Sequence, residues 1–179
     1  LKIPLTVGGG VRSTDDAQRL LEAGADKVAV NSAAVERPTL LSELSKAYGK
    51  QCTVVAVDAA RTEEGTWSVM VRGGRVRTAL SAIPWMREAE ALGAGEVLLT
   101  SWDQDGTRSG YDLELLGAAS RALRIPIIAS GGANTPQHMV DALAQGASAV
   151  LAASIFHDQD LTCKAVKEAL RDAGIEVRP

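Results

Sequence analysis

Two glycine-rich turns have the composition of phosphate-binding sites. Gly8-Gly9-Gly10 and Ser130-Gly131-Gly132 each follow a short apolar run and precede an expected helix. Such turns present backbone N–H groups and the positive end of a helix dipole to an anion. Each turn pairs with a second polar segment at the end of the next apolar run, Asn31-Ser32 and Ala153-Ser154 respectively. One such turn is a weak signal, whereas two in the same pattern predict a ligand with two phosphate groups.

Between these turns the chain carries a carboxylate suited to proton transfer. Asp58 directly follows the apolar run Thr53–Val57, so it is expected at a strand end. The structural alternative is a helix-capping or ion-paired aspartate, with Arg61 as its partner. A carboxylate at this position is more typical of general acid–base catalysis, which is the role we predict.

Other charged residues are less informative on their own. Asp103 and Asp105 share a loop with Gly106 and resemble a metal loop, but no further acidic ligands lie nearby, so we predict neither a metal nor another cofactor. Lys27 and Glu96 each come just before an apolar run, at the opposite end from Asp58. Taken alone, their position favours simple solvation of two strand starts.

Alternating strands and helices are expected to position these residues. The apolar runs predict strands at Ile3–Val7, Lys27–Val30, Thr53–Val57, Val97–Ser101, Pro126–Ala129 and Ala149–Ala152. Capping residues and helical spacing predict helices at 13–23, 38–48, 82–92, 113–123 and 161–173, and a further helix that begins at Thr135 with Pro136 at its first position. The segment Thr66–Arg77 predicts a surface hairpin with a Gly-Gly turn. Continuous apolar strands are typical of a parallel sheet buried on both faces.

An internal repeat indicates how these units are arranged. An offset of 122 residues, from Ile3 to Ile125, superimposes both glycine turns. It also aligns five further identical pairs: Leu21 with Leu143, Gly24 with Gly146, Ala25 with Ala147, Val28 with Val150, and Ser32 with Ser154. The alternative explanation for these identities is that two similar βα units converged on the same packing. The repeat favours two equal half-barrels, which would contain eight strands, two more than the six expected here.

We therefore predict an α/β fold in which residues 1–179 form a single, incomplete TIM-barrel domain. They would be the C-terminal six βα units of a (β/α)₈ barrel with a half-barrel repeat. Active sites of such barrels lie at the carboxyl ends of the strands, which would place both glycine turns and Asp58 at one mouth. Lys27 and Glu96 would then lie at the bottom of the barrel.

The composition excludes several classes of partner. The net charge is −3 and the isoelectric point is about 5.4, which argues against a protein that binds nucleic acid or anionic membranes by bulk charge. The longest apolar run, Ala147–Phe156, is far shorter than the roughly 20 residues that span a bilayer. The two cysteines, Cys52 and Cys163, favour reduced thiols in a cytoplasmic protein.

Five segments together resemble the cyclase subunit of imidazole glycerol phosphate synthase, from histidine biosynthesis. They are Leu5-Thr6-Val7-Gly8-Gly9-Gly10, Asp26-Lys27-Val28, Val55-Ala56-Val57-Asp58-Ala59, the run from Leu99 to Asp112, and Ile128-Ala129-Ser130-Gly131-Gly132. The resemblance covers the whole chain. A sister isomerase of the same pathway shares the half-barrel repeat and both phosphate sites. The Asp-x-Asp-Gly-Thr-x-Ser-Gly-Tyr-Asp pattern at 103–112 favours the cyclase.

The resemblance implies a reaction and a partner. Ammonia from a glutaminase subunit docked at the barrel bottom would attack N′-phosphoribulosyl-formimino-aminoimidazole-carboxamide ribotide, a bisphosphate. The products would be imidazole glycerol phosphate and aminoimidazole carboxamide ribotide. Asp58 matches a catalytic aspartate of the family. The ammonia passage and its charged gate match Thr6, Lys27 and Glu96, which replaces the solvation interpretation. Substrate and phosphate contacts match Gly10, Asn31, Ser32, Thr100, Asp105, Gly106, Ser130, Gly131, Gly132, Ala153 and Ser154.

One departure from the family pattern affects the expected activity. The second catalytic aspartate and a lysine on a mobile loop belong to the family's first βα unit, which we expect to be absent before Leu1. We therefore expect these residues alone to have little cyclase activity. Two alternatives stay open: the sister isomerase, which needs no ammonia, and a non-enzymatic scaffold that binds a bisphosphate.

Overall fold

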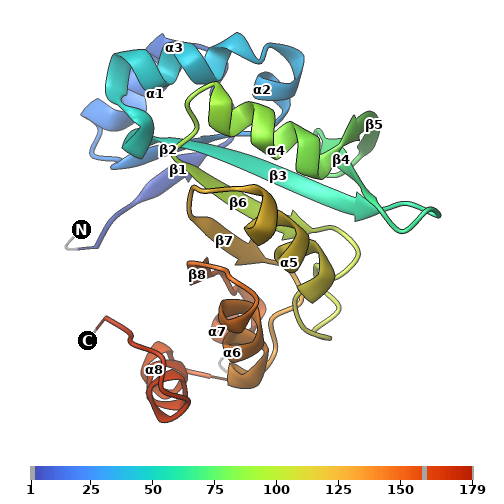
Figure 1. The fold of residues 1–179 in the computed structure, drawn as a ribbon. Coiled ribbons are helices and arrows are strands. Elements are labelled where there is room, and N and C mark those ends of the chain that lie inside the picture. Colours follow the sequence, from blue (N-terminus) through green and yellow to red (C-terminus); the bar gives the residue numbers. More distant parts are fainter. Residues whose placement is uncertain (1–2, 159–160, 179) are drawn as a thin grey trace.

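The computed structural model describes residues 3–158 and 161–178, and its centre is a curled, mostly parallel sheet (Figure 1). Six parallel strands of the described residues lie in the order β1-β2-β3-β6-β7-β8. Their bounds are β1 Thr6–Gly8, β2 Lys27–Val30, β3 Thr53–Arg61, β6 Glu96–Ser101, β7 Ile127–Ser130 and β8 Ala149–Val150. This α/β sheet is the partial barrel that the sequence predicts, with β1 and β8 at the two edges of the described sheet.

Helices follow the strands along the chain and cover the convex side of the sheet (Figure 1). They are α1 Thr14–Glu22, α2 Ser32–Glu36, α3 Thr39–Tyr48, the 3₁₀ turn η1 Lys50–Cys52, α4 Ala82–Ala91, α5 Leu113–Ala122, α6 Pro136–Ala144, α7 Ser154–His157 and α8 Cys163–Asp172. The core lies between helices and sheet, where Leu40, Leu44 and Met86 are fully buried. Burial of these apolar side chains is the main force that holds the two layers together.

The expectation of strands buried on both faces is wrong for half of the strand residues. Val57 and Leu99 point toward the helices and are buried. Ala56, Leu98 and Ile128, on the opposite face, are only half-buried. Alternate strand residues point to opposite faces, so only one face lies against helices. The other face lines the concave side of the curled sheet, where Ala29 and Val54 are buried but Ala56, Leu98 and Ile128 are only half-buried.

The predicted hairpin exists, but it belongs partly to the sheet. β4 Trp67–Val71 pairs antiparallel with β3, so Asp58 lies opposite Met70. β5 Val76–Ser81 pairs only with β4 among the described strands. Pairing with β4 also explains why β3 runs to Arg61, past the predicted end at Val57. The turn at 72–75 is left-handed at three successive residues, with φ of 56°, 66° and 76°.

The internal repeat is confirmed in the backbone. α1 and α6 have the same bounds at the 122-residue offset, and both begin after a hydroxyl N-cap, Ser13 and Thr135. The glycine turns match as well, with φ of 93° and 79° in the first copy and 97° and 89° in the second. The short helices α2 and α7, which sequence patterns did not predict, also begin at equivalent positions.

The cysteines and the helix lengths bear on two further expectations. Cys52 is half-buried and Cys163 is exposed, and neither forms a disulfide. Among residues 3–158 and 161–178, no helix is both long and apolar enough to cross a membrane.

Candidate functional site

The carboxyl ends of the strands bring most of the predicted site residues together. Asp58 on β3 lies beside Thr100 on β6, and Thr100 lies beside Ser130 on β7 in the parallel register. All three are half-buried. Because residues in register on neighbouring parallel strands point to the same face, their side chains form one polar row on the concave side of the sheet.

Asp58 lies in an environment that favours its protonated form. Burial raises the pKa of its carboxyl group, and the nearby Asp105 carboxylate raises this pKa further. A hydrogen bond from Asn31 acts in the opposite direction and is the weakest of the three effects. A carboxyl group with a raised pKa is a better proton donor near neutral pH, which agrees with the predicted acid–base role.

Asn31 contacts this carboxylate. Its Nδ2 atom donates a hydrogen bond to Asp58 Oδ2 at 3.0 Å. Its Oδ1 atom is buried and has no hydrogen-bond partner among the described residues. The structure thus links Asn31 to Asp58, whereas the sequence assigned it to a phosphate site. Only the pairing of β2 with β3 brings the two side chains together, so the sequence pattern gave no signal for this contact.

The first glycine turn is open around its backbone. A Cβ atom added to Gly9 or Gly10 would meet no atom within 4 Å. The neighbouring Ser32 accepts a hydrogen bond from the backbone N–H of Arg72 at 2.8 Å. The turn between β4 and β5 therefore lies against this site, which the sequence did not predict.

The second glycine turn packs tightly against the loop that follows β6. A Cβ atom on Gly132 would lie 2.1 Å from the carbonyl oxygen of Gly110, and one on Gly131 would lie 2.8 Å from that of Ser101. The Gly110 N–H donates to the Gly132 carbonyl at 2.8 Å. The loop residues Asp105 and Gly106 are exposed beside this turn. Ala153 and Ser154 stand at the start of α7, in the place that Asn31 and Ser32 occupy at the start of α2.

At the opposite end of the strands, the two predicted gate residues form an ion pair. Lys27 Nζ lies 2.7 Å from Glu96 Oε2, and the side chains are 31% and 17% exposed. Thr6 lies beside Lys27 in the register of β1 with β2. Simple solvation of two separate charges is therefore wrong, since the charges neutralise each other across β3. Glu96 and Thr100 lie four residues apart on β6, so roughly 13 Å of strand separates the ion pair from the polar row.

The acidic loop after β6 does not gather a metal-ligand set. In the part of the chain that the structure describes, no three His, Cys, Asp or Glu side chains come together to hold a metal ion. Asp103 instead accepts a hydrogen bond from the backbone N–H of Arg61 at 2.7 Å. Asp105 acts on Asp58 across the mouth, as its effect on the Asp58 pKa indicates.

Comparisons with known proteins agree with this architecture. The profile of the family described as "Histidine biosynthesis protein" matches residues 1–162. The imidazole glycerol phosphate synthase subunit HisF of Gluconacetobacter diazotrophicus is 57% identical over 176 residues, which cover 98% of this chain and 68% of that protein. The HisF subunit of Endomicrobium trichonymphae is 55% identical over 176 residues, again covering 98% of this chain and 68% of that protein. That of Streptomyces avermitilis is 54% identical over 176 residues, with 98% of this chain and 70% of that protein covered. The chain therefore belongs to the histidine biosynthesis protein family, among the HisF subunits of imidazole glycerol phosphate synthase.

Proposed function

We propose that this chain carries the cyclase chemistry of imidazole glycerol phosphate synthase. In this reaction, ammonia attacks N′-phosphoribulosyl-formimino-aminoimidazole-carboxamide ribotide. The products are imidazole glycerol phosphate and aminoimidazole carboxamide ribotide. The names of the similar proteins support this assignment. The observation that carries it is the half-buried Asp58, held by Asn31 between two repeated glycine turns.

The two glycine turns would hold the two phosphate groups of the substrate. Each turn is followed by a nine-residue helix, α1 or α6. Backbone N–H groups and the helix dipole stabilise negative charge at such a turn. Because the copies stand on β1 and β7, a substrate bound to both would stretch across the row formed by Asp58, Thr100 and Ser130.

Asp58 would transfer protons at the middle of the bound substrate. Its raised pKa favours retention of a proton that the carboxyl group can donate to a leaving nitrogen. After donation, the carboxylate can accept a proton from the attacking ammonia nitrogen. Asn31 would keep Oδ2 in place, since its amide bonds to that oxygen. Such positioned groups contribute about 10²- to 10⁴-fold to a rate.

Ammonia would enter from the end opposite Asp58. The Lys27–Glu96 ion pair stands there, and Thr6 lies beside it in the register. Between the ion pair and the polar row, the concave face carries Ala56 and Leu98, which offer no polar atoms. An apolar wall admits neutral ammonia more readily than ammonium, because it cannot solvate a charge. We propose that a glutaminase subunit docks at this end and supplies the ammonia.

An assay with external ammonium tests the proposal. The resemblance assigns the second catalytic aspartate to a βα unit outside these residues. The assay therefore contains the chain together with a second polypeptide, the segment of the Gluconacetobacter diazotrophicus relative that lies outside the matched region. We expect imidazole glycerol phosphate only when ammonium is present. The Asp58→Asn variant should lower the rate by at least about 100-fold while leaving substrate binding in place.

The alternatives give other results. Conversion of substrate without ammonium would favour the sister isomerase. Calorimetric binding of the bisphosphate with no turnover, even with the added segment, would favour a non-enzymatic scaffold.

A further inference from the structure

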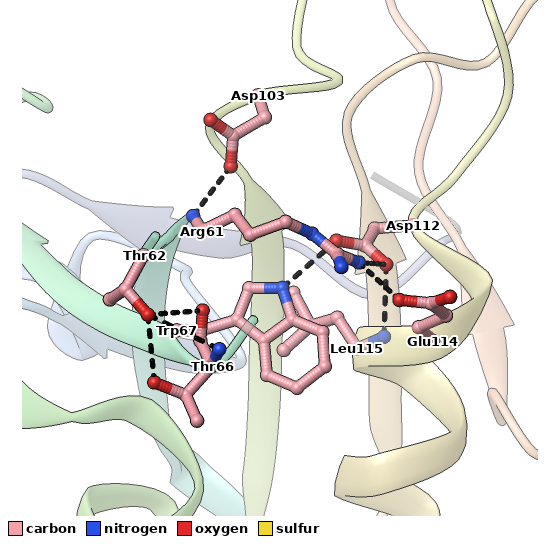
Figure 2. Close-up of polar contacts among 8 residues, drawn as sticks. All are labelled: Arg61, Thr62, Thr66, Trp67, Asp103, Asp112, Glu114 and Leu115. Atoms are coloured by element: carbon pink, nitrogen blue, oxygen red, sulfur yellow. Dashed lines mark hydrogen bonds and ion pairs between the residues drawn. The ribbon is translucent and has the colours of Figure 1, made fainter. Parts of the chain in front are cut away.

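We infer that Arg61 is a positioning residue that fastens both ends of the loop 103–112 to the strand that carries Asp58. The inference deepens the proposed function and rests on the proposed role of Asp58. We name the group formed by Arg61, Trp67, Asp103, Asp112 and Glu114 the Arg61 clasp (Figure 2).

The start of the loop is bound to the end of β3. The Arg61 backbone N–H donates to Asp103 Oδ2 at 2.7 Å. The N–H of Trp102, one residue earlier, donates to the carbonyl of Ala59 at 2.9 Å. Both bonds join the last residues of β3 to the first residues after β6, so the loop leaves the sheet in one fixed direction.

The end of the loop is bound to the side chain of the same arginine. The buried Asp112 accepts hydrogen bonds from Leu115 N at 2.9 Å, from Trp67 Nε1 at 3.0 Å and from Arg61 Nη2 at 3.5 Å. Arg61 Nη2 also lies 2.6 Å from Glu114 Oε2, and the guanidinium lies 5.1 Å from the centre of the Trp67 ring. Burying a carboxyl group costs free energy unless it is hydrogen-bonded, so these donors and the guanidinium hold Asp112 in place at the start of α5. Figure 2 shows the guanidinium reaching from β3 to the start of α5.

Between its two fastened ends, the loop is held by its own hydrogen bonds. Ser109 Oγ lies 2.6 Å from both Gln104 Oε1 and Thr107 Oγ1. The Gly110 N–H binds the carbonyl of Gly132 in the second glycine turn. The Asp105 N–H also donates to the Ser101 carbonyl at 3.0 Å, so the position of Asp105 depends on this bond together with the clasp at the two ends of the loop.

The clasp therefore connects two groups of the proposed site. Asp58 is three residues before Arg61 on β3, and Asp105 is two residues after Asp103 in the loop. The groups that act on the Asp58 carboxyl are Asn31, through a hydrogen bond, and Asp105, through its charge. Coulomb interaction falls with distance, so a displaced loop would weaken the interaction between Asp58 and Asp105.

The test is a double-variant measurement of that interaction by NMR. Carboxyl carbon shifts give the pKa of Asp58 with and without the Asp105→Asn change, first in the wild type and then in Arg61→Gln. In the wild type, Asp105→Asn should lower the pKa of Asp58. In Arg61→Gln, we expect the effect of Asp105→Asn to fall by about half or more.

A matched control separates positioning from general loss of a cation. Among the described residues, Arg77 donates hydrogen bonds to the carbonyls of Ala60 and Arg61 at 3.2 and 3.3 Å and to Ser68 Oγ at 3.3 Å, and none of these acceptors belongs to the loop 103–112. Arg77→Gln should leave the Asp58–Asp105 interaction unchanged. Arg61→Gln removes only the side-chain contacts at the end of the loop, because the backbone N–H of residue 61 can still bind Asp103. If Arg61→Gln does not fold, Asp103→Ala removes that backbone hydrogen bond at an exposed site, and it should reduce the interaction in the same direction.

The inference and the proposed function can fail separately. The titration needs no turnover, so an unchanged interaction in folded Arg61→Gln or Asp103→Ala would overturn the positioning role even if Asp58→Asn were inactive. In the assembled enzyme, Arg61→Gln should lower kcat by about tenfold because Asp105 is displaced relative to Asp58, and KM should rise as well because Asp105 and Gly106 of the same loop are predicted phosphate contacts. A change confined to KM would likewise contradict positioning.

Discussion

Alanine at the two repeat-related glycines Gly10 and Gly132 should have unequal costs, although their backbones are nearly the same. Both are left-handed, with φ of 79° and 89°. An alanine in this region costs about 1–2 kcal/mol relative to glycine, because its Cβ crowds the following carbonyl. A Cβ at position 10 meets nothing within 4 Å, so Gly10→Ala should cost only that amount.

At Gly132 a second cost is added. The new Cβ would lie 2.1 Å from the carbonyl oxygen of Gly110, which is backbone and cannot rotate away. The loop must therefore shift by roughly 1 Å, with an overpacking cost of about 1–3 kcal/mol. The shift also weakens the bond from Gly110 N–H to Gly132 O, for about another 1 kcal/mol. The sum for Gly132→Ala is about 3–6 kcal/mol.

Urea denaturation of the two variants beside the wild type measures this difference. The repeat supplies the control, since Gly10→Ala makes the same chemical change at the same φ. The free energy of unfolding should fall by about 2–4 kcal/mol more in Gly132→Ala than in Gly10→Ala. Losses that agree within about 0.5 kcal/mol would refute the tight packing of the loop on the second glycine turn.

Three further predictions follow from single contacts. The raised pKa of Asp58 means that the folded state penalises its charge, so stability is lost as pH rises through that pKa. Asp58→Asn should thus unfold at higher urea than the wild type at neutral pH, and the difference should vanish below about pH 3. Glu96→Gln should lower the free energy of unfolding by about 1 kcal/mol through loss of the Lys27 ion pair, and urea curves should show part of this recovered in the double variant with Lys27→Met. Thr135→Ala should lower the free energy of unfolding by about 1 kcal/mol, because it removes the N-cap hydrogen bond from the His138 N–H. In thermal unfolding, the control variant Thr135→Ser should be near wild type, because serine keeps the hydroxyl group.

Local signals in the chain were sufficient to predict the βα order and the repeat. Ser13 and Thr135 cap their helices as expected, because an N-cap hydroxyl acts on residues three positions away. The glycine turns could be recognised for the same reason, since glycine adopts a positive φ without the steric cost that other residues have. These features depend on neighbours in sequence, and a pattern can therefore indicate them.

Contacts between strands were harder to predict. The Asn31–Asp58 hydrogen bond depends on the register of β2 with β3, and nothing near either residue specifies it. The pairing of β4 with β3 could not be predicted, because the alternation of apolar and polar residues in a hairpin does not indicate which other strand the hairpin pairs with. The Lys27–Glu96 pair was suggested only by the family resemblance, since the residues are far apart in the chain. The helices α2 and α7 are too short to show helical spacing.

The most direct test of the central claim is turnover by Asp58→Asn in the assembled enzyme. The chain is combined with the unmatched part of the Gluconacetobacter diazotrophicus relative and supplied with the bisphosphate substrate and ammonium. We expect the wild-type mixture to form imidazole glycerol phosphate. The Asp58→Asn mixture should bind substrate equally and react at least about 100-fold more slowly. Equal rates in the two mixtures would contradict the assignment of Asp58 as the proton-transfer group.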